Sequence, residues 1–180
     1  MVTIPSVEKL LGSDWAKIDE NLMGEFGWKE ILKQFLDEER SKPLAAAWEG
    51  DRYVLYEQKQ TKKLILVARL RLDSEDHAGR FLEEYSEALQ KKYGMRVHAS
   101  GQPDFFSFDT PEGGVFLRCV KTECISVEGT SRAVFDGING MIGWPAVTAA
   151  PKVTAAASIR LDPTPVVVKE KQETRPRAEP

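Results

Sequence analysis

The sequence predicts an α+β domain, in which an antiparallel β-sheet carries helices mainly on one face, followed by a disordered C-terminal tail. Residues 43–73 resemble a short helix that runs into two alternating strands with a polar turn between them. Residues 25–38 and 74–93 each place apolar side chains on one stripe at helical spacing. After Trp144 the composition changes to Ala, Pro, Val and Thr, without Gly or aromatic residues.

Short elements are expected at the N-terminus. Residues 2–4 suit a short strand, and residues 6–11 suit a brief helical turn that Gly12 ends. Residues 15–20 alternate in polarity, which leaves a strand and a loop open as alternatives.

The first long helix is predicted over residues 25–38. Its core-facing stripe is expected to consist of Phe26, Ile31, Leu32, Phe35 and Leu36. A short helix should then begin at Pro43, because proline is tolerated in the first helical turn, and run through Ala47.

The central hairpin is predicted from alternation. Gly50 and Asp51 are interpreted as the turn that leads into it. Residues 53–57 and 64–72 form its strands, with residues 58–61 as the polar turn between them.

A long helix should follow the hairpin, with Asp73 or Ser74 as its N-cap and Gly94 as its end. Lys91 and Lys92 in its last turn suit the helix dipole.

Three strands are predicted near residues 104–109, 115–120 and 124–128, and a last helix over residues 131–142. The apolar side of that helix is expected to be Ala133, Val134, Ile138 and Met141. The two long helices should cover one face of the sheet.

Two cysteines, Cys119 and Cys124, flank a predicted turn at residues 121–123 and could face each other across it. The alternatives are two half-buried thiols, a disulfide or redox pair, and a metal site.

The folded domain is predicted over residues 1–143 and the disordered tail over 144–180, because the tail is rich in proline and charge. The alternative is that residues 165–168 add an edge strand.

Charge and hydropathy exclude some classes. The formal net charge is −3, which does not suit a nucleic-acid-binding protein. No apolar run reaches the roughly 18 residues of a membrane span, and no signal peptide is visible. The chain is expected to be cytoplasmic if Met1 is the true start, and exported if it is a fragment of a longer precursor.

No motif for catalysis, metal or cofactor binding is present. The only histidines, His77 and His98, are 21 positions apart and fit no zinc-ligand spacing. Phosphate-binding glycine loops and the G-x-S-x-G elbow are also missing. We therefore predict no catalytic residue, no metal and no cofactor for this chain.

Five residues are candidates for a ligand site. Trp48, Asp51 and Tyr53 lie around the start of the hairpin and could line a groove, although anchoring of this corner is the competing interpretation. Arg69 and Arg71 share one face of a strand, where they could bind an anion or pair with acids on a neighbouring strand.

Several strings together resemble a known family. They are residues 24–27, the A-W-E-G-D-R-Y string at 47–53, the junction at 72–74 with Phe81 after it, and residues 127–129. Their order and spacing are similar to the C-terminal α+β part of a poorly characterised family of bacterial zinc metallopeptidases.

The resemblance covers about residues 2–130 and departs from that family in one decisive respect. In the family, a helical N-terminal half carries an H-E-x-x-H motif, and this half is missing from the present chain. No zinc ligand or catalytic glutamate can therefore be transferred to this sequence.

The sequence thus predicts a non-catalytic accessory or protein-interaction domain, with an unknown protein as its partner. Two alternatives stay open: the separated C-terminal part of a zinc metallopeptidase, and a small-ligand binding domain.

Overall fold

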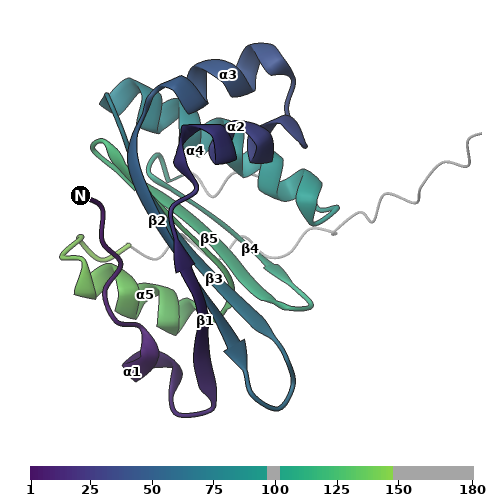
Figure 1. The fold of residues 1–180 in the computed structure, drawn as a ribbon, viewed down its shortest axis with the longest axis vertical. Coiled ribbons are helices and arrows are strands. Elements are labelled where there is room, and N and C mark those ends of the chain that lie inside the picture. The colour runs from purple at the N-terminus through teal and green to yellow at the C-terminus, as the bar shows by residue number, and fades with distance from the viewer. Residues whose placement is uncertain (97–101, 148–180) are drawn as a thin grey trace, which may run out of the picture.

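The computed structural model describes residues 1–96 and 102–147, and these form one antiparallel sheet covered by helices on both faces (Figure 1). The strand order is β1-β2-β3-β6-β5-β4. The predicted α+β class is confirmed, whereas the predicted tail lies outside the described residues from position 148 onward. The elements are α1 (Glu8–Leu11), β1 (Trp15–Asn21), α2 (Gly24–Lys33), α3 (Glu38–Ala46), β2 (Trp48–Gln58), β3 (Leu64–Leu72), α4 (Glu75–Lys92), β4 (Phe105–Thr110), β5 (Gly113–Val120), β6 (Glu123–Thr130) and α5 (Arg132–Met141).

Three hairpins build most of the sheet, and the central pair comes from elements distant in sequence. Strand β3 pairs with β6, with Val67 opposite Val127, and the chain travels between the two strands through α4 and the β4–β5 hairpin. Because successive strand residues point to opposite faces, strands β2 to β6 contribute side chains to two separate cores.

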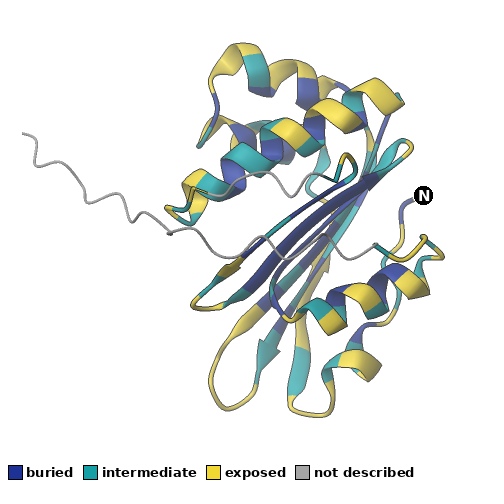
Figure 2. Ribbon diagram, turned by 180° about the vertical axis from the view of Figure 1, so that it is seen from behind, coloured by how far each residue is buried: buried dark blue, intermediate teal, exposed yellow. Residues whose placement is uncertain are grey.

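The larger core lies between the sheet and helices α2, α3 and α4. Trp28 of α2 packs edge-to-face against Phe81 and Tyr85 of α4, at ring-centroid distances of 5.4 and 5.6 Å. Figure 2 shows the buried sides of these helices turned toward the sheet and their exposed sides turned outward.

The smaller core lies on the other face, beneath α5, α1 and the N-terminal segment. Phe135 of α5 stacks on Phe116 of β5, with ring centroids 4.9 Å apart. Helices therefore cover both faces, although three of the five lie on one face, in agreement with the predicted arrangement.

Helix α4 begins where the sequence predicts it. The Ser74 hydroxyl accepts a hydrogen bond from the His77 backbone N–H at 3.2 Å, as an N-cap does. A similar cap starts α5, where Ser131 accepts from the Val134 N–H at 3.4 Å.

The first predicted long helix is shorter than expected. Helix α2 ends at Lys33 instead of residue 38, because Asp37 caps a new helix, α3, through the Arg40 backbone N–H at 2.9 Å. Pro43 lies inside α3 and does not begin it. Residues 2–4, expected as a short strand, are not part of the sheet.

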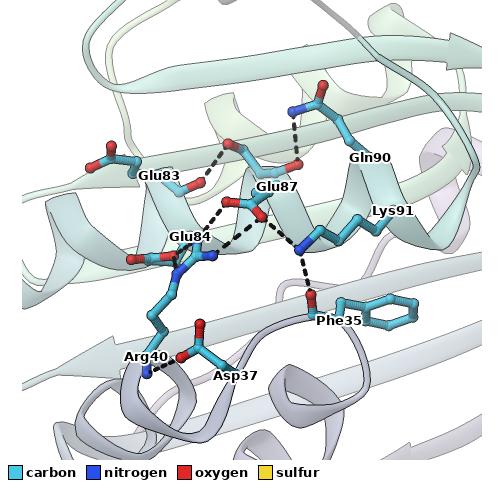
Figure 3. A network of polar contacts seen from close by, with 9 residues as sticks. Phe35, Asp37, Arg40, Glu83, Glu84, Glu87, Gln90 and Lys91 are labelled. Carbon is cyan, nitrogen blue, oxygen red and sulfur yellow. Dashed lines mark hydrogen bonds and ion pairs between the residues drawn. The ribbon is translucent and has the colours of Figure 1, made fainter.

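A polar network fastens α3 to the outer side of α4 (Figure 3). Arg40 forms ion pairs with Glu84 and Glu87, and its Nε lies 2.5 Å from Glu84. Lys91 donates to Glu87 at 2.6 Å and to the Phe35 carbonyl at 2.8 Å. These hydrogen bonds lower the pKa of Glu87 to about 2.

Cys119 and Cys124 form a disulfide between the neighbouring strands β5 and β6. Both side chains are buried beneath α4, so the predicted alternative of a disulfide pair is the one realised.

The chain continues to contact the domain after α5. The Trp144 ring lies 5.9 Å from the Arg69 guanidinium and 5.8 Å from that of Arg118. Arg118 also donates to the Pro145 carbonyl at 2.5 Å. Residues 144–147 thus pack beside the smaller core, beyond the predicted domain boundary at 143.

No helix within the described ranges is both long and apolar enough to cross a membrane.

Candidate functional site

The corner formed by Trp48 and Asp51 is an anchor for helix α2. The interpretation of Gly50 and Asp51 as a turn is wrong, because β2 already begins at Trp48 and continues through both residues. Asp51 is 2% exposed and accepts three hydrogen bonds, from the N–H groups of Met23 and Gly24 at 2.8 and 2.9 Å and from the Trp48 indole at 2.8 Å.

This carboxylate does what a local cap does for other helices. Helix α2 has no side-chain cap of its own, and its first N–H groups would otherwise lack partners. A negative charge at a helix N-terminus is also favourable for the helix dipole. Asp51 therefore ties α2 to the sheet across 27 residues of sequence.

Tyr53 lies further along β2 on the same face of the sheet. Its hydroxyl donates to Asp19 of the neighbouring strand β1 at 2.7 Å. The hydrogen bond to this carboxylate raises the pKa of the Tyr53 phenol. Tyr53 thus holds the edge strand β1 against β2.

The two predicted arginines pair with an acid on a neighbouring strand. Glu123 of β6 accepts from Arg69 at 2.5 Å and from Arg71 at 2.6 Å, so one carboxylate bridges both guanidinium groups. Burial alone would raise the pKa of Glu123, but the hydrogen bonds from Arg71 and Arg69 lower it. Arg69 additionally donates to the Thr3 carbonyl at 2.9 Å.

The five predicted residues do not meet in one pocket. Asp51 and Tyr53 pair with Leu70 and Ala68, which belong to the larger core beneath α4. Arg69 and Arg71 alternate with those residues and therefore point to the other face, toward Trp144 and the N-terminal segment. The sheet separates the aromatic corner from the arginines.

A surface that the sequence interpretation missed begins at the edge strand β1. Ile18, Leu22 and Phe26 are 49%, 54% and 75% exposed, and they follow one another through β1 into the first turn of α2. We call these three residues the β1–α2 apolar surface. Phe26 was expected in the core, so its exposure is a correction to the predicted helix stripe.

A helical projection explains the correction. Trp28, Ile31, Leu32 and Phe35 lie at the spacings of one helix face, and Trp28 is buried at 2% exposure. Phe26 precedes Trp28 by two residues, which rotates it about 200° around the helix axis. Trp28 and Phe26 cannot both face the core, and the position of Trp28 opposite Phe26 was the signal available in the sequence.

Among residues 1–96 and 102–147, no three His, Cys, Asp or Glu side chains form a group that could hold an ion. His77, half-buried, is hydrogen-bonded to Asp73 at 2.5 Å, whereas His98 lies outside the described residues.

Fold and surface together define an α+β domain whose predicted site residues stabilise its own elements. Residues 10–139 match the sequence model of a family described as a domain of unknown function, DUF8575, and the chain belongs to that family. No curated protein and no solved structure matches the chain. The family description assigns no activity, so the resemblance to zinc metallopeptidases stays a prediction.

Proposed function

We propose that this chain is a non-catalytic protein-interaction domain and that its partner binds the β1–α2 apolar surface. One observation carries the proposal: Phe26 is 75% exposed although the same helix buries Trp28 and Leu32. Single exposed apolar residues are common, but three within nine residues indicate an interaction site.

The fold does not need these side chains. Helix α2 is held by the burial of Trp28 and Leu32 and by the hydrogen bonds to Asp51. Because Phe26 is exposed, its apolar surface stays in contact with water and does not stabilise the domain. A partner that covers the ring would recover that free energy.

The partner is expected to contact side chains instead of adding a strand. Strand β1 lies at the edge of the sheet, but its pairing with β2 is interrupted by an irregularity between Lys17 and Asp19. Exposed charges at Lys17, Asp19 and Glu20 follow its length. Bulges and charges of this kind discourage pairing with another strand.

Charge further defines the partner. Residues 19–30 contain four acidic side chains, Asp19, Glu20, Glu25 and Glu30, and one basic side chain, Lys29. Asp19 accepts from Tyr53 and Glu20 pairs with Lys17, whereas Glu25 and Glu30 are exposed on α2, one and four positions from Phe26. We therefore expect a partner with an apolar pocket for Phe26 and with Lys or Arg side chains around it.

Photo-crosslinking in the source cells tests this surface. Phe26 is replaced by p-benzoylphenylalanine, and the same replacement at exposed Ala133, on α5 across the sheet, is the matched control. We expect a discrete adduct with one other protein from position 26 only. Adducts of equal pattern from both positions, adducts only with a second copy of this chain, or no adduct would contradict the proposal.

Binding to the captured protein is then measured with purified components. Phe26→Ser should weaken the complex at least tenfold, because an aromatic anchor at an interface centre contributes much of the affinity. The free energy of unfolding of the Phe26→Ser variant should stay within about 0.5 kcal/mol of wild type, since the Phe26 side chain is exposed. Met141→Ser, at an exposed methionine on α5, is the control and should bind like wild type.

The metallopeptidase alternative makes a narrower statement about the partner. If the chain works with a separately encoded catalytic half, the adduct from position 26 should be a protein that contains an H-E-x-x-H helix. An adduct with a protein that lacks this motif would leave the interaction proposal intact and remove this alternative.

A further inference from the structure

An apolar cleft lies between helices α2 and α4 and strand β3, and we call it the α2–α4 cleft. Its volume is about 170 Å³. Ile31 of α2, Leu66 of β3 and Leu89 of α4 are among the apolar residues of its wall. The exposed Gln34 also lines it, so the cleft opens to solvent. Lys92 is the one charged residue among the described residues that line it.

Phe26 and the cleft occupy neighbouring parts of α2. Met23 lines the cleft and precedes Phe26 by three positions, a spacing at which side chains on a helix are neighbours. At 100° per residue, Gly27 lies between Phe26 and Ile31 around the helix and adds no side chain there. The exposed ring of Phe26 therefore lies beside the wall of the cleft.

We propose that the chain self-associates through these two features, so that Phe26 of each copy inserts into the α2–α4 cleft of a second copy. The cleft is slightly larger than engineered apolar cavities of about 150 Å³, which accept a benzene ring. Because the ring and the cleft lie side by side on one copy, a two-fold rotation brings each ring to the other cleft. Such an exchange closes the assembly at two copies.

The charges around the ring and the cleft are complementary between copies. Glu25 and Glu30 are exposed one and four positions from Phe26. Lys92 in the cleft wall is partly exposed and donates to Glu128, which uses one of the three N–H groups of its ammonium. Insertion of Phe26 brings acidic side chains toward this lysine, which favours a second copy as the occupant of the cleft.

Self-association deepens the proposed function and rests on it, because it names what covers the β1–α2 apolar surface before the partner binds. The cleft has the features that we expect of the partner's pocket, an apolar wall with a basic side chain beside it. A dimer held by two exchanged rings has a small interface and is weak, since association also costs translational and rotational freedom. The partner therefore displaces the second copy, and the dimer covers Phe26 while the partner is missing.

Sedimentation of the purified full chain over a series of concentrations tests the dimer. We expect reversible formation of a species of two copies, and Phe26→Ser should weaken this association at least tenfold. Met141→Ser, at an exposed methionine on α5, is the control and should associate like wild type. A chain that stays monomeric at every concentration, or a Phe26→Ser variant that dimerises like wild type, would overturn the proposal.

A mixture of two variants tests the exchange itself. Ala88→Leu fills the cleft and keeps Phe26, whereas Phe26→Ser removes the ring and keeps the cleft. Neither variant should dimerise alone, but the mixture should form a heterodimer, because the ring of the first variant fits the cleft of the second. If Ala88→Leu does not fold, Gln34→Trp at the exposed rim of the cleft takes its place. A folded cleft variant that dimerises like wild type, or a mixture without heterodimer, would overturn the proposal.

Photo-crosslinking of the purified chain locates the contact. With p-benzoylphenylalanine at position 26, the adduct should join this position to residues 85–92 of α4 in the second copy. An adduct only with the β1–α2 apolar surface of the second copy would overturn the proposal. A monomeric purified chain leaves the capture of another protein in the source cells unaffected, so failure of this proposal is distinguishable from failure of the proposed function.

Discussion

Asp51 and Glu128 are two buried carboxylates on the same face of one sheet, and they differ in how completely they are hydrogen-bonded. Asp51 is 2% exposed and receives three donors, of which two are the backbone N–H groups of Met23 and Gly24 at the start of α2. Glu128 is 3% exposed and receives two donors, both on one oxygen. The β3 residues opposite them, Leu70 and Leu66, are only four positions apart.

The difference lies in which groups supply the donors. Every donor to Asp51 is fixed by a helix or by the corner itself, so this carboxylate completes the fold and has little capacity for a ligand. Glu128 accepts instead from Lys92 and Tyr93, side chains at the C-terminal end of α4, and the Lys92 side chain is partly exposed.

Removal of Asp51 should give the largest effect. Asp51→Ala leaves three donors without an acceptor and detaches the start of α2, so we expect the free energy of unfolding to fall by about 3 kcal/mol. Trp48→Phe is the matched control. It removes one of the three hydrogen bonds and keeps an aromatic ring, and it should cost about 1 kcal/mol.

Urea denaturation of both variants measures these losses. A near-wild-type Asp51→Ala would contradict the anchoring role. That result would instead favour the interpretation of Trp48, Asp51 and Tyr53 as a ligand site.

Removal of the Glu128 carboxylate should have a much smaller effect. Glu128→Met removes the acceptor of the Lys92 and Tyr93 hydrogen bonds, but both donors are partly exposed and can bind water, so we expect a loss of about 1 kcal/mol. Lys92 is partly exposed and can turn to solvent when its partner is removed. A loss as large as that of Asp51→Ala, in the same urea experiment, would show that Glu128 is structural.

A third carboxylate, Glu87 on the outer side of α4, should give the smallest effect and one that depends on pH. Its folded-state pKa is lowered from 4.5 to about 2, so its stabilising contribution is complete above pH 4.5 and disappears as pH falls toward 2. The side chain is 42% exposed, and solvent screening limits the contribution to about 1 kcal/mol or less.

Arg40→Gln tests this contribution, because the hydrogen bond from Arg40 is the main cause of the lowered pKa of Glu87. The stability difference between wild type and variant should shrink as pH falls from 4.5 to 2 in thermal unfolding scans. A difference that stays constant over that interval would show that the ion pair does not depend on the charge of Glu87.

The sequence was sufficient to predict those elements whose structure depends only on neighbouring residues. The alternation of residues 64–72 predicted β3, and the Ser74 cap with acidic residues after it predicted the start of α4. The cysteine spacing around a turn predicted two residues that could meet, and the structure joins them as a disulfide. In each case the partners lie within a few residues, so spacing alone fixes the geometry.

Other positions depended on contacts between distant segments. Phe26 and Trp28 are both aromatic, and packing against Phe81 and Tyr85 of α4 decides which of them is buried. Asp51 resembles a turn residue until α2 is placed above it, 27 positions earlier in the chain. Arg69 and Arg71 were grouped with Asp51 because the sequence does not show which face of a strand meets which helix.

The sequence by itself determined the α+β class, the hairpins and the start of α4, because periodicity and caps are local properties. Only the tertiary structure decided the roles of the carboxylates. Whether a buried oxygen finds a donor depends on side chains brought together from separate elements: α2 and Trp48 for Asp51, α4 for Glu128. That pairing exists only once the helices have packed on the sheet.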